Sequence, residues 1–96
     1  MNFIEKFFTT IRQPKIYIHT PYPAISENVQ NILFKLGYRY WLDQSTSPKY
    51  ASKKYVVVYR NCTGLYTNDY DDIAACTIEA SVFFRMANSS TLKKLH

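Results

Sequence analysis

The stretch PAISENVQNILFKLG, residues 23–37, decides the fold class because it carries the clearest periodic pattern in the chain. Its apolar residues fall on one stripe of a helix: Ile25, Val29, Ile32, Leu33 and Leu36. Pro23 suits the first turn, and Gly37 suits the left-handed position that follows a helix end. Ser26 or Thr20 can cap the start. We therefore predict an amphipathic helix that packs its apolar stripe against another layer.

Strand patterns on both sides of this helix predict that the other layer is a sheet. Residues 15–19 alternate, with Ile16 and Ile18 on one face and Tyr17 on the other. Residues 53–59 place tyrosines 55 and 59 with valine 57 on one face and valines 56 and 58 on the other. Both faces of that strand are apolar, which predicts a central position in the sheet.

Three further segments are predicted around this central strand. Residues 38–42 have the aromatic alternation of a strand, and residues 65–67 return as a hairpin partner after a turn at 61–64. Residues 71–86 are ambiguous, and we favour a short helical turn followed by a strand. That strand rests on the alternation of four apolar residues: Ile78, Ala80, Val82 and Phe84.

The N-terminal segment has helical periodicity over residues 2–12, which ends at Gln13 because the residue before Pro14 is pushed out of the α region. Its apolar residues are Phe3, Ile4, Phe7, Phe8 and Ile11. So short a helix must bury this face against its own sheet, another protein or a second copy in a homodimer. Residues 88–96 are polar and basic, and we expect them to fray.

The predicted fold class is α+β, with a small antiparallel or mixed sheet of about four strands and one main helix packed across it. An extra amphipathic helix precedes this core. We expect a single domain over residues 1–96, with the N-terminal helix in 1–13, the α+β core in 15–86 and the basic tail in 88–96.

Composition sets limits on the class of protein. The 96 residues are 47% hydrophobic and 20% charged, which is typical of a globular chain, and nine are tyrosine. With two glycines there is no room for a glycine-rich phosphate loop. The net charge of +5 favours nucleic acid or an acidic partner. No secretory signal and no membrane-spanning window occur, so we expect a cytoplasmic protein without membrane contact.

The sequence holds no recognisable catalytic or metal-binding motif. Asp69, Asp71 and Asp72 cluster, but turn and capping roles account for them without a metal. His19 has no nucleophile motif beside it. Cys62 and the other cysteine, at 76, do not match a zinc spacing, and we expect two separate reduced thiols. We therefore predict a protein that is not an enzyme and carries no cofactor or metal.

Two candidate binding surfaces remain. The first joins cations that can contact phosphates to rings that can stack on bases: Arg39, Lys49, Tyr50, Lys53, Lys54 and Tyr55. It would bind RNA or single-stranded DNA without reading sequence, and the alternative is a solvated loop. The second is a protein-binding surface made of aromatic residues: Phe3, Phe7, Phe8, Tyr38, Tyr40 and Trp41.

The middle of the chain also resembles a family. Ile16-Tyr17-Ile18, the helix that ends in Leu36-Gly37-Tyr38 and runs on to Trp41, and the strand 54–59 together resemble small accessory proteins of tailed bacteriophages. The resemblance covers about residues 15–85 and transfers no functional residue. It implies a non-enzymatic protein that binds and inhibits or modulates a host or anti-phage defence macromolecule in the bacterial cytoplasm.

Overall fold

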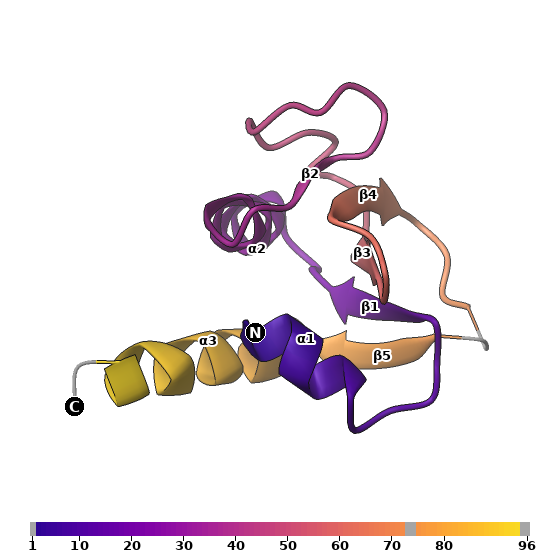
Figure 1. The fold of residues 1–96 in the computed structure, drawn as a ribbon. Coiled ribbons are helices and arrows are strands. Elements are labelled where there is room, and N and C mark those ends of the chain that lie inside the picture. The colour runs from indigo at the N-terminus through magenta and orange to yellow at the C-terminus, as the bar shows by residue number, and fades with distance from the viewer. Residues whose placement is uncertain (1, 73–74, 95–96) are drawn as a thin grey trace.

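The computed structural model describes residues 2–72 and 75–94, which form a mixed sheet and helices (Figure 1). The elements follow in the order α1 (Phe3–Phe8), β1 (Lys15–His19), α2 (Pro23–Lys35), β2 (Arg39–Tyr40), β3 (Tyr55–Tyr59), β4 (Gly64–Asn68), β5 (Cys76–Glu79) and α3 (Ala80–Lys94). The α+β class is confirmed, and the sheet has five strands where we expected about four.

The strand order is β2-β4-β3-β1-β5, so the valine-rich strand β3 is central, as its two apolar faces predicted. It pairs antiparallel with β1 on one side and with β4 on the other. The predicted hairpin is therefore confirmed. The outer pairs, β1 with β5 and β2 with β4, are parallel, which makes the sheet mixed. β2 is shorter than predicted because Trp41 already begins a turn.

Helix α2 ends as its glycine predicted. Gly37 has φ +103°, and its backbone N–H donates to the Phe34 carbonyl at 3.1 Å. The Tyr38 N–H reaches back to the Leu33 carbonyl at 3.0 Å. Together the two bonds form a Schellman motif, which satisfies carbonyls at the helix end.

The start of α2 differs from the prediction. Pro23 lies in the first turn, but the N-cap is Tyr22, which makes no capping bond with its side chain. Thr20 is buried and donates to the Lys54 carbonyl at 3.2 Å. The buried Ser26 hydroxyl accepts a bond from Gln30 at 3.1 Å. Both predicted caps therefore have other bonds inside the fold.

The C-terminal third is the largest correction to the sequence prediction. The strand predicted to run through Ile78, Val82 and Phe84 ends at Glu79, and α3 begins at Ala80. Phe83 is the helix residue that enters the core, and it is fully buried. The segment 88–94, expected to fray, continues α3. The helical turn predicted from Asp71 or Asp72 through Cys76 includes residues 73 and 74, which lie outside the described part, and Cys76 begins β5 instead.

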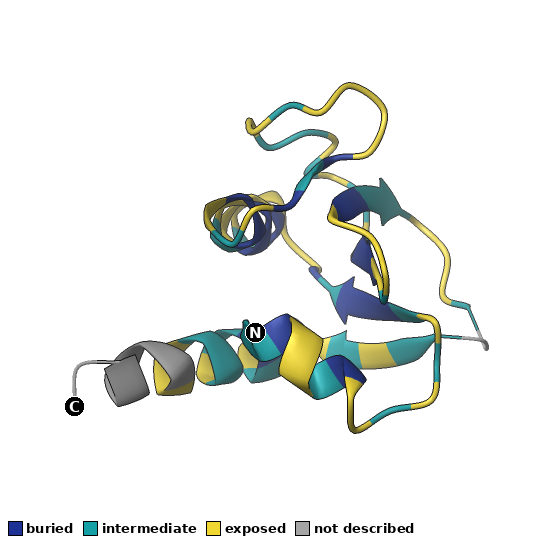
Figure 2. Cartoon of the chain, in the orientation of Figure 1, coloured by how far each residue is buried: buried dark blue, intermediate teal, exposed yellow. Residues whose placement is uncertain are grey.

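The core lies between one face of the sheet and all three helices. Its buried residues include Ile16, Ile18, Val56, Val58 and Leu65 from the strands and Ile4, Phe8, Val29, Leu33 and Phe83 from the helices. In Figure 2 much of β1 and part of α1 are coloured as buried, and the loop between β2 and β3 is mostly exposed. The N-terminal helix, shorter than predicted, thus packs within its own domain. Its Phe3 ring meets Phe83 at 5.4 Å between centroids.

Candidate functional site

The other face of the sheet is lined by tyrosines and lies outside the core cluster. Side chains alternate along a strand, so the residues between the core positions of β1, β3 and β4 point together to this side. The strand registers place Tyr17 opposite Val57 and Val57 opposite Tyr66. We call this surface the tyrosine face and define it by five residues: Tyr17, Tyr55, Val57, Tyr59 and Tyr66.

The rings of the tyrosine face lie against one another. Tyr17 contacts Tyr55 at 5.6 Å between centroids, and Tyr59 contacts Tyr66 at 5.8 Å. The Lys15 ammonium lies 5.5 Å from the centre of the Tyr17 ring and 5.8 Å from that of Tyr59. Tyr17 is only 2% exposed although it belongs to no part of the core cluster. Neighbouring rings on the face itself therefore help to bury it.

The hydroxyl groups of the tyrosine face lie in polar or buried surroundings. Burial, reinforced by the neighbouring Tyr17 and Tyr59, raises the pKa of the Tyr66 phenol. The Asn68 side-chain amide donates to the Tyr17 hydroxyl at 3.4 Å. The face is thus apolar in its rings and polar at their ends.

At one edge the tyrosine face opens into a hollow of about 450 Å³, which we call the Trp41 hollow. It is lined by Tyr40, Trp41, Leu42, Tyr59, Tyr66 and Thr67. Trp41 is 57% exposed and Leu42 is 70% exposed, which is unusual for large apolar side chains. Gly64 makes room for the indole, because a Cβ there would lie 3.2 Å from Trp41 Cδ1.

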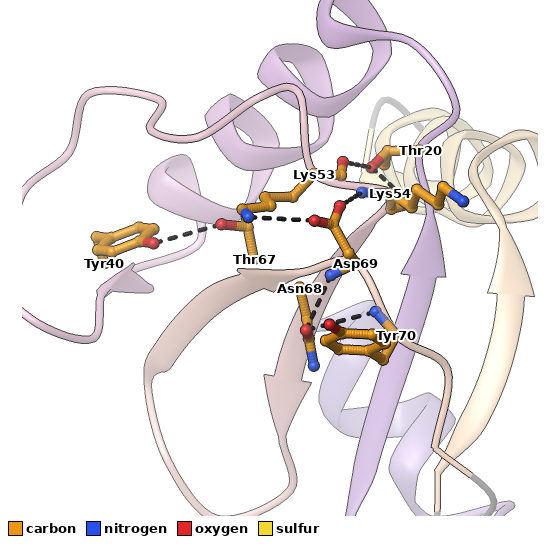
Figure 3. Close-up of polar contacts among 8 residues, drawn as sticks. All are labelled: Thr20, Tyr40, Lys53, Lys54, Thr67, Asn68, Asp69 and Tyr70. Atoms are coloured by element: carbon orange, nitrogen blue, oxygen red, sulfur yellow. Dashed lines mark hydrogen bonds and ion pairs between the residues drawn. The ribbon is translucent and has the colours of Figure 1, made fainter.

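The predicted nucleic-acid residues do not form one free basic surface. The Lys49 ammonium pairs with Asp43 at 2.8 Å, and Lys53 pairs with Asp69 at 3.1 Å (Figure 3). The partner lysines lower the pKa of both carboxyls, which keeps the pairs ionised. Lys54 is exposed, and its backbone N–H also bonds to Asp69 at 3.3 Å.

The other members of that set lie apart. Arg39 donates to the Phe34 and Tyr38 carbonyls, at 3.3 and 2.7 Å, and so holds the end of α2. The Tyr50 ring lies against the Tyr40 ring, with 5.9 Å between their centroids. Only Tyr55 belongs to the tyrosine face.

Most of the predicted protein-binding aromatics are part of the fold. Phe8, Tyr38 and Tyr40 are each less than 5% exposed, and burial raises the pKa of Tyr38. Phe3 and Phe7 are half-buried and pack on the core cluster. A partner can reach the buried rings of Phe8, Tyr38 and Tyr40 only if the domain rearranges, whereas Phe3 and Phe7 keep part of their surface accessible. Trp41 is the member of this set that is both exposed and beside the tyrosine face.

The residues weighed for chemistry have structural contacts. Asp69 pairs with Lys53, and Asp72 pairs with Lys15 at 2.6 Å, while the Thr77 hydroxyl donates to Asp71. His19 and Glu79 approach to 2.9 Å across the β1–β5 pair. Within residues 2–72 and 75–94 no three His, Cys, Asp or Glu side chains gather as a metal site. Cys62 is exposed and Cys76 is half-buried, and the structure joins neither of them in a disulfide.

Sequence reasoning missed Tyr17, Tyr59 and Tyr66 as site residues. Alternation in residues 53–59 placed Tyr55 and Tyr59 on one face, but it did not show that this face is left uncovered by the helices. Two signals were available: the nine tyrosines of the chain, and the alternation in residues 15–19 that places Tyr17 on the face opposite Ile16 and Ile18.

Comparisons of the chain with protein-family models, with characterised proteins and with solved structures found no match. In the described part of the chain, no helix has the length and apolar character needed to cross a bilayer.

Proposed function

We propose that this protein acts by binding another protein through its tyrosine face and the adjoining Trp41 hollow. The observation that carries the proposal is a sheet face surfaced by tyrosine rings, outside the core cluster, with exposed Trp41 at its edge. Tyrosine and tryptophan are enriched in protein interfaces, where they supply apolar area together with a polar group.

The rings are also held in place before any partner arrives. The Tyr59 and Tyr66 rings contact each other, and the Tyr17 ring contacts Tyr55. The Tyr17 hydroxyl also accepts a bond from Asn68. A side chain that is already ordered loses less rotamer freedom when a complex forms. This pre-organisation supports a binding role for a face that would otherwise expose ring area to water without benefit.

A sequence-nonspecific nucleic-acid module remains the alternative, and the charges favour it less. Two of its three predicted lysines, Lys49 and Lys53, are matched by Asp43 and Asp69. A phosphate would have to displace those carboxylates. The tyrosine face itself offers rings for stacking, but its Lys15 is bound by Asp72.

The class of partner is carried over from the resemblance to phage accessory proteins. We propose a host or anti-phage defence protein in the bacterial cytoplasm, inhibited or modulated by contact and not by catalysis. The polar residues weighed for catalysis instead pair with one another, as His19 does with Glu79 and Asp69 with Lys53, which fits a binding role.

The test compares variants that remove one exposed aromatic ring each. Trp41→Ser and Tyr59→Ser change the proposed surface, and Tyr22→Ser is the matched control, since Tyr22 is 66% exposed at the start of α2. The tagged proteins are incubated with nuclease-treated bacterial lysate, and any stoichiometric complex is then reconstituted from purified components. We expect at least a tenfold weaker complex for the first two variants and no change for the control.

Three results would point elsewhere. Equal binding by all three variants would place the interface on another surface. A complex that disappears with nuclease, and with alanine at Lys49, Lys53 and Lys54, would favour the nucleic-acid module. A complex that contains only a second copy of the chain, with dimerisation lost in Trp41→Ser, would make the face a homodimer interface.

A further inference from the structure

We infer that the edge of the tyrosine face around Tyr59 is a peptide site that takes an acidic segment carrying an aromatic side chain. This inference rests on the proposed protein-binding function and names the chemistry that the partner must present. It follows from two hollows that meet at one tyrosine, one of them aromatic and the other cationic.

The two hollows share Tyr59. One is the Trp41 hollow, in which apolar lining dominates. The second has a volume of about 400 Å³ and is lined by Arg12, Pro14, Tyr59, Arg60, Asn61 and Cys62. A ligand that lies across the Tyr59 ring therefore meets aromatic side chains on one side and the exposed cation of Arg12 on the other. The Arg60 guanidinium faces α1, where it lies over the Phe8 ring.

The positive charge in the second hollow is not matched by a carboxylate. Arg60 donates to the Phe8, Ile11 and Gln13 carbonyls at 2.6, 2.6 and 3.0 Å, so its partners are neutral. Arg12 is exposed and has no ion pair among the described residues. None of the residues that line either hollow is acidic. Glu5 lines an adjoining hollow that shares Arg60, Asn61 and Cys62. Asp72 is bound by Lys15 at 2.6 Å.

The arrangement fits a peptide better than an oligonucleotide. A nucleic acid carries one phosphate for every base, whereas the lining of the Trp41 hollow contains no lysine or arginine. One anionic group beside one apolar group matches the two hollows.

The test uses the single tryptophan of the chain as a local reporter. Uniformly 15N-labelled full-length protein is titrated with a terminally blocked Asp-Phe-Asp-Phe peptide, and the indole N–H signal of Trp41 is followed. A second titration uses Asn-Phe-Asn-Phe. We expect saturable shifts with the acidic peptide and about threefold to tenfold weaker binding of the amide peptide, the range for a partly exposed ion pair.

Substitutions test which cationic side chain binds the acidic peptide. Arg12→Gln should weaken the acidic peptide by a similar factor, while Lys35→Gln, which removes an exposed cation from the end of α2, should have no effect. Tyr59→Leu keeps an apolar side chain but removes the shared ring and should weaken the binding of both peptides. Neither Arg12 nor Lys35 takes part in the core, so each variant is expected to fold.

The inference is wrong if the Trp41 signal does not shift at millimolar acidic peptide, or if the acidic and amide peptides bind equally. It is also wrong if an oligo-dT binds more tightly and displaces the peptide, which would assign the site to nucleic acid. In the first two cases, loss of the protein complex in Trp41→Ser would leave the proposed function standing. If the peptide result fails and Trp41→Ser also leaves the protein complex intact, the proposed function is wrong as well.

Discussion

Replacing Gln30 by Met is expected to destabilise the fold by about 2–4 kcal/mol. Gln30 is fully buried on α2 and clamps the loop that follows Trp41. Its Oε1 accepts the Lys49 backbone N–H at 2.9 Å, and its Nε2 donates to the Lys49 carbonyl at 3.0 Å and to Ser26 Oγ at 3.1 Å. Met has a similar length, so the change removes polar partners while leaving little cavity.

The magnitude follows from the groups left behind. An unpaired buried backbone group costs about 1–3 kcal/mol, and two such groups of Lys49 lose their partner. Lys49 is half-buried, so water restores part of the loss and keeps the total well below the sum of the upper values. Ser26 adds a smaller amount, because its hydroxyl oxygen loses only one accepted bond.

Urea unfolding followed by far-UV circular dichroism measures this change. With an m value of about 1–3 kcal/mol/M, the midpoint should fall by roughly 1–2 M. Asn31→Met is the control, since Asn31 is exposed on the same helix and its replacement should shift stability by less than about 0.5 kcal/mol. If Gln30→Met is as stable as this control, the clamp does not hold the loop as described.

Further substitutions test the end of α2, the position of the Trp41 indole and the Lys53–Asp69 ion pair. Gly37→Ala should destabilise the fold by about 1–2 kcal/mol in thermal or urea unfolding because φ is +103° at this residue. The cost comes from the backbone alone, since a Cβ there would meet no atom within 4 Å. An unchanged Tm would mean that the left-handed position is not retained in solution. Gly64→Ala should displace Trp41, whose Cδ1 would lie 3.2 Å from the new Cβ, and so change its fluorescence maximum; an unaltered spectrum would place the indole elsewhere. The hydrogen bond from Lys53 lowers the pKa of Asp69, so the stabilisation that this pair provides is present above the ordinary pKa of 3.8 and is lost as the pH falls through the lower folded value. Lys53→Gln should therefore flatten the dependence of stability on acid pH. Identical pH profiles of the two proteins would show that the pair contributes nothing.

Local patterns predicted the elements whose signals lie within one segment. Helix α2 has a full apolar stripe and a glycine at its end, and β3 has two apolar faces, so both were predicted with their places in the fold. The residues at Ile78, Ala80, Val82 and Phe84 alternate as in a strand. The competing helical spacing places Ala80, Phe83 and Phe84 on one side, and burial of Phe83 between the helices and the sheet decides for α3.

The candidate site depends on pairings between distant segments, which local patterns do not contain. Tyr17 and Tyr66 come to lie on either side of Val57 only through the registers of β1, β3 and β4. The same limit applies to the basic loop. The Lys53 ammonium is matched by Asp69, which follows the partner strand of the hairpin, and a charge count does not show this contact. Trp41 entered the predicted site as part of an aromatic strand, and the structure shows that it is exposed.

The most direct test of binding through the tyrosine face is site-specific photo-cross-linking. A benzoylphenylalanine is placed at Tyr59 in one sample and at Tyr22 in another, since both positions carry exposed aromatic rings on different surfaces. The proteins are irradiated in bacterial cells, and the products are treated with nuclease before mass analysis. We predict a single protein adduct from position 59 and none from position 22. An adduct from position 22 alone, or one that nuclease removes from position 59, would show that the tyrosine face is not a protein-binding surface.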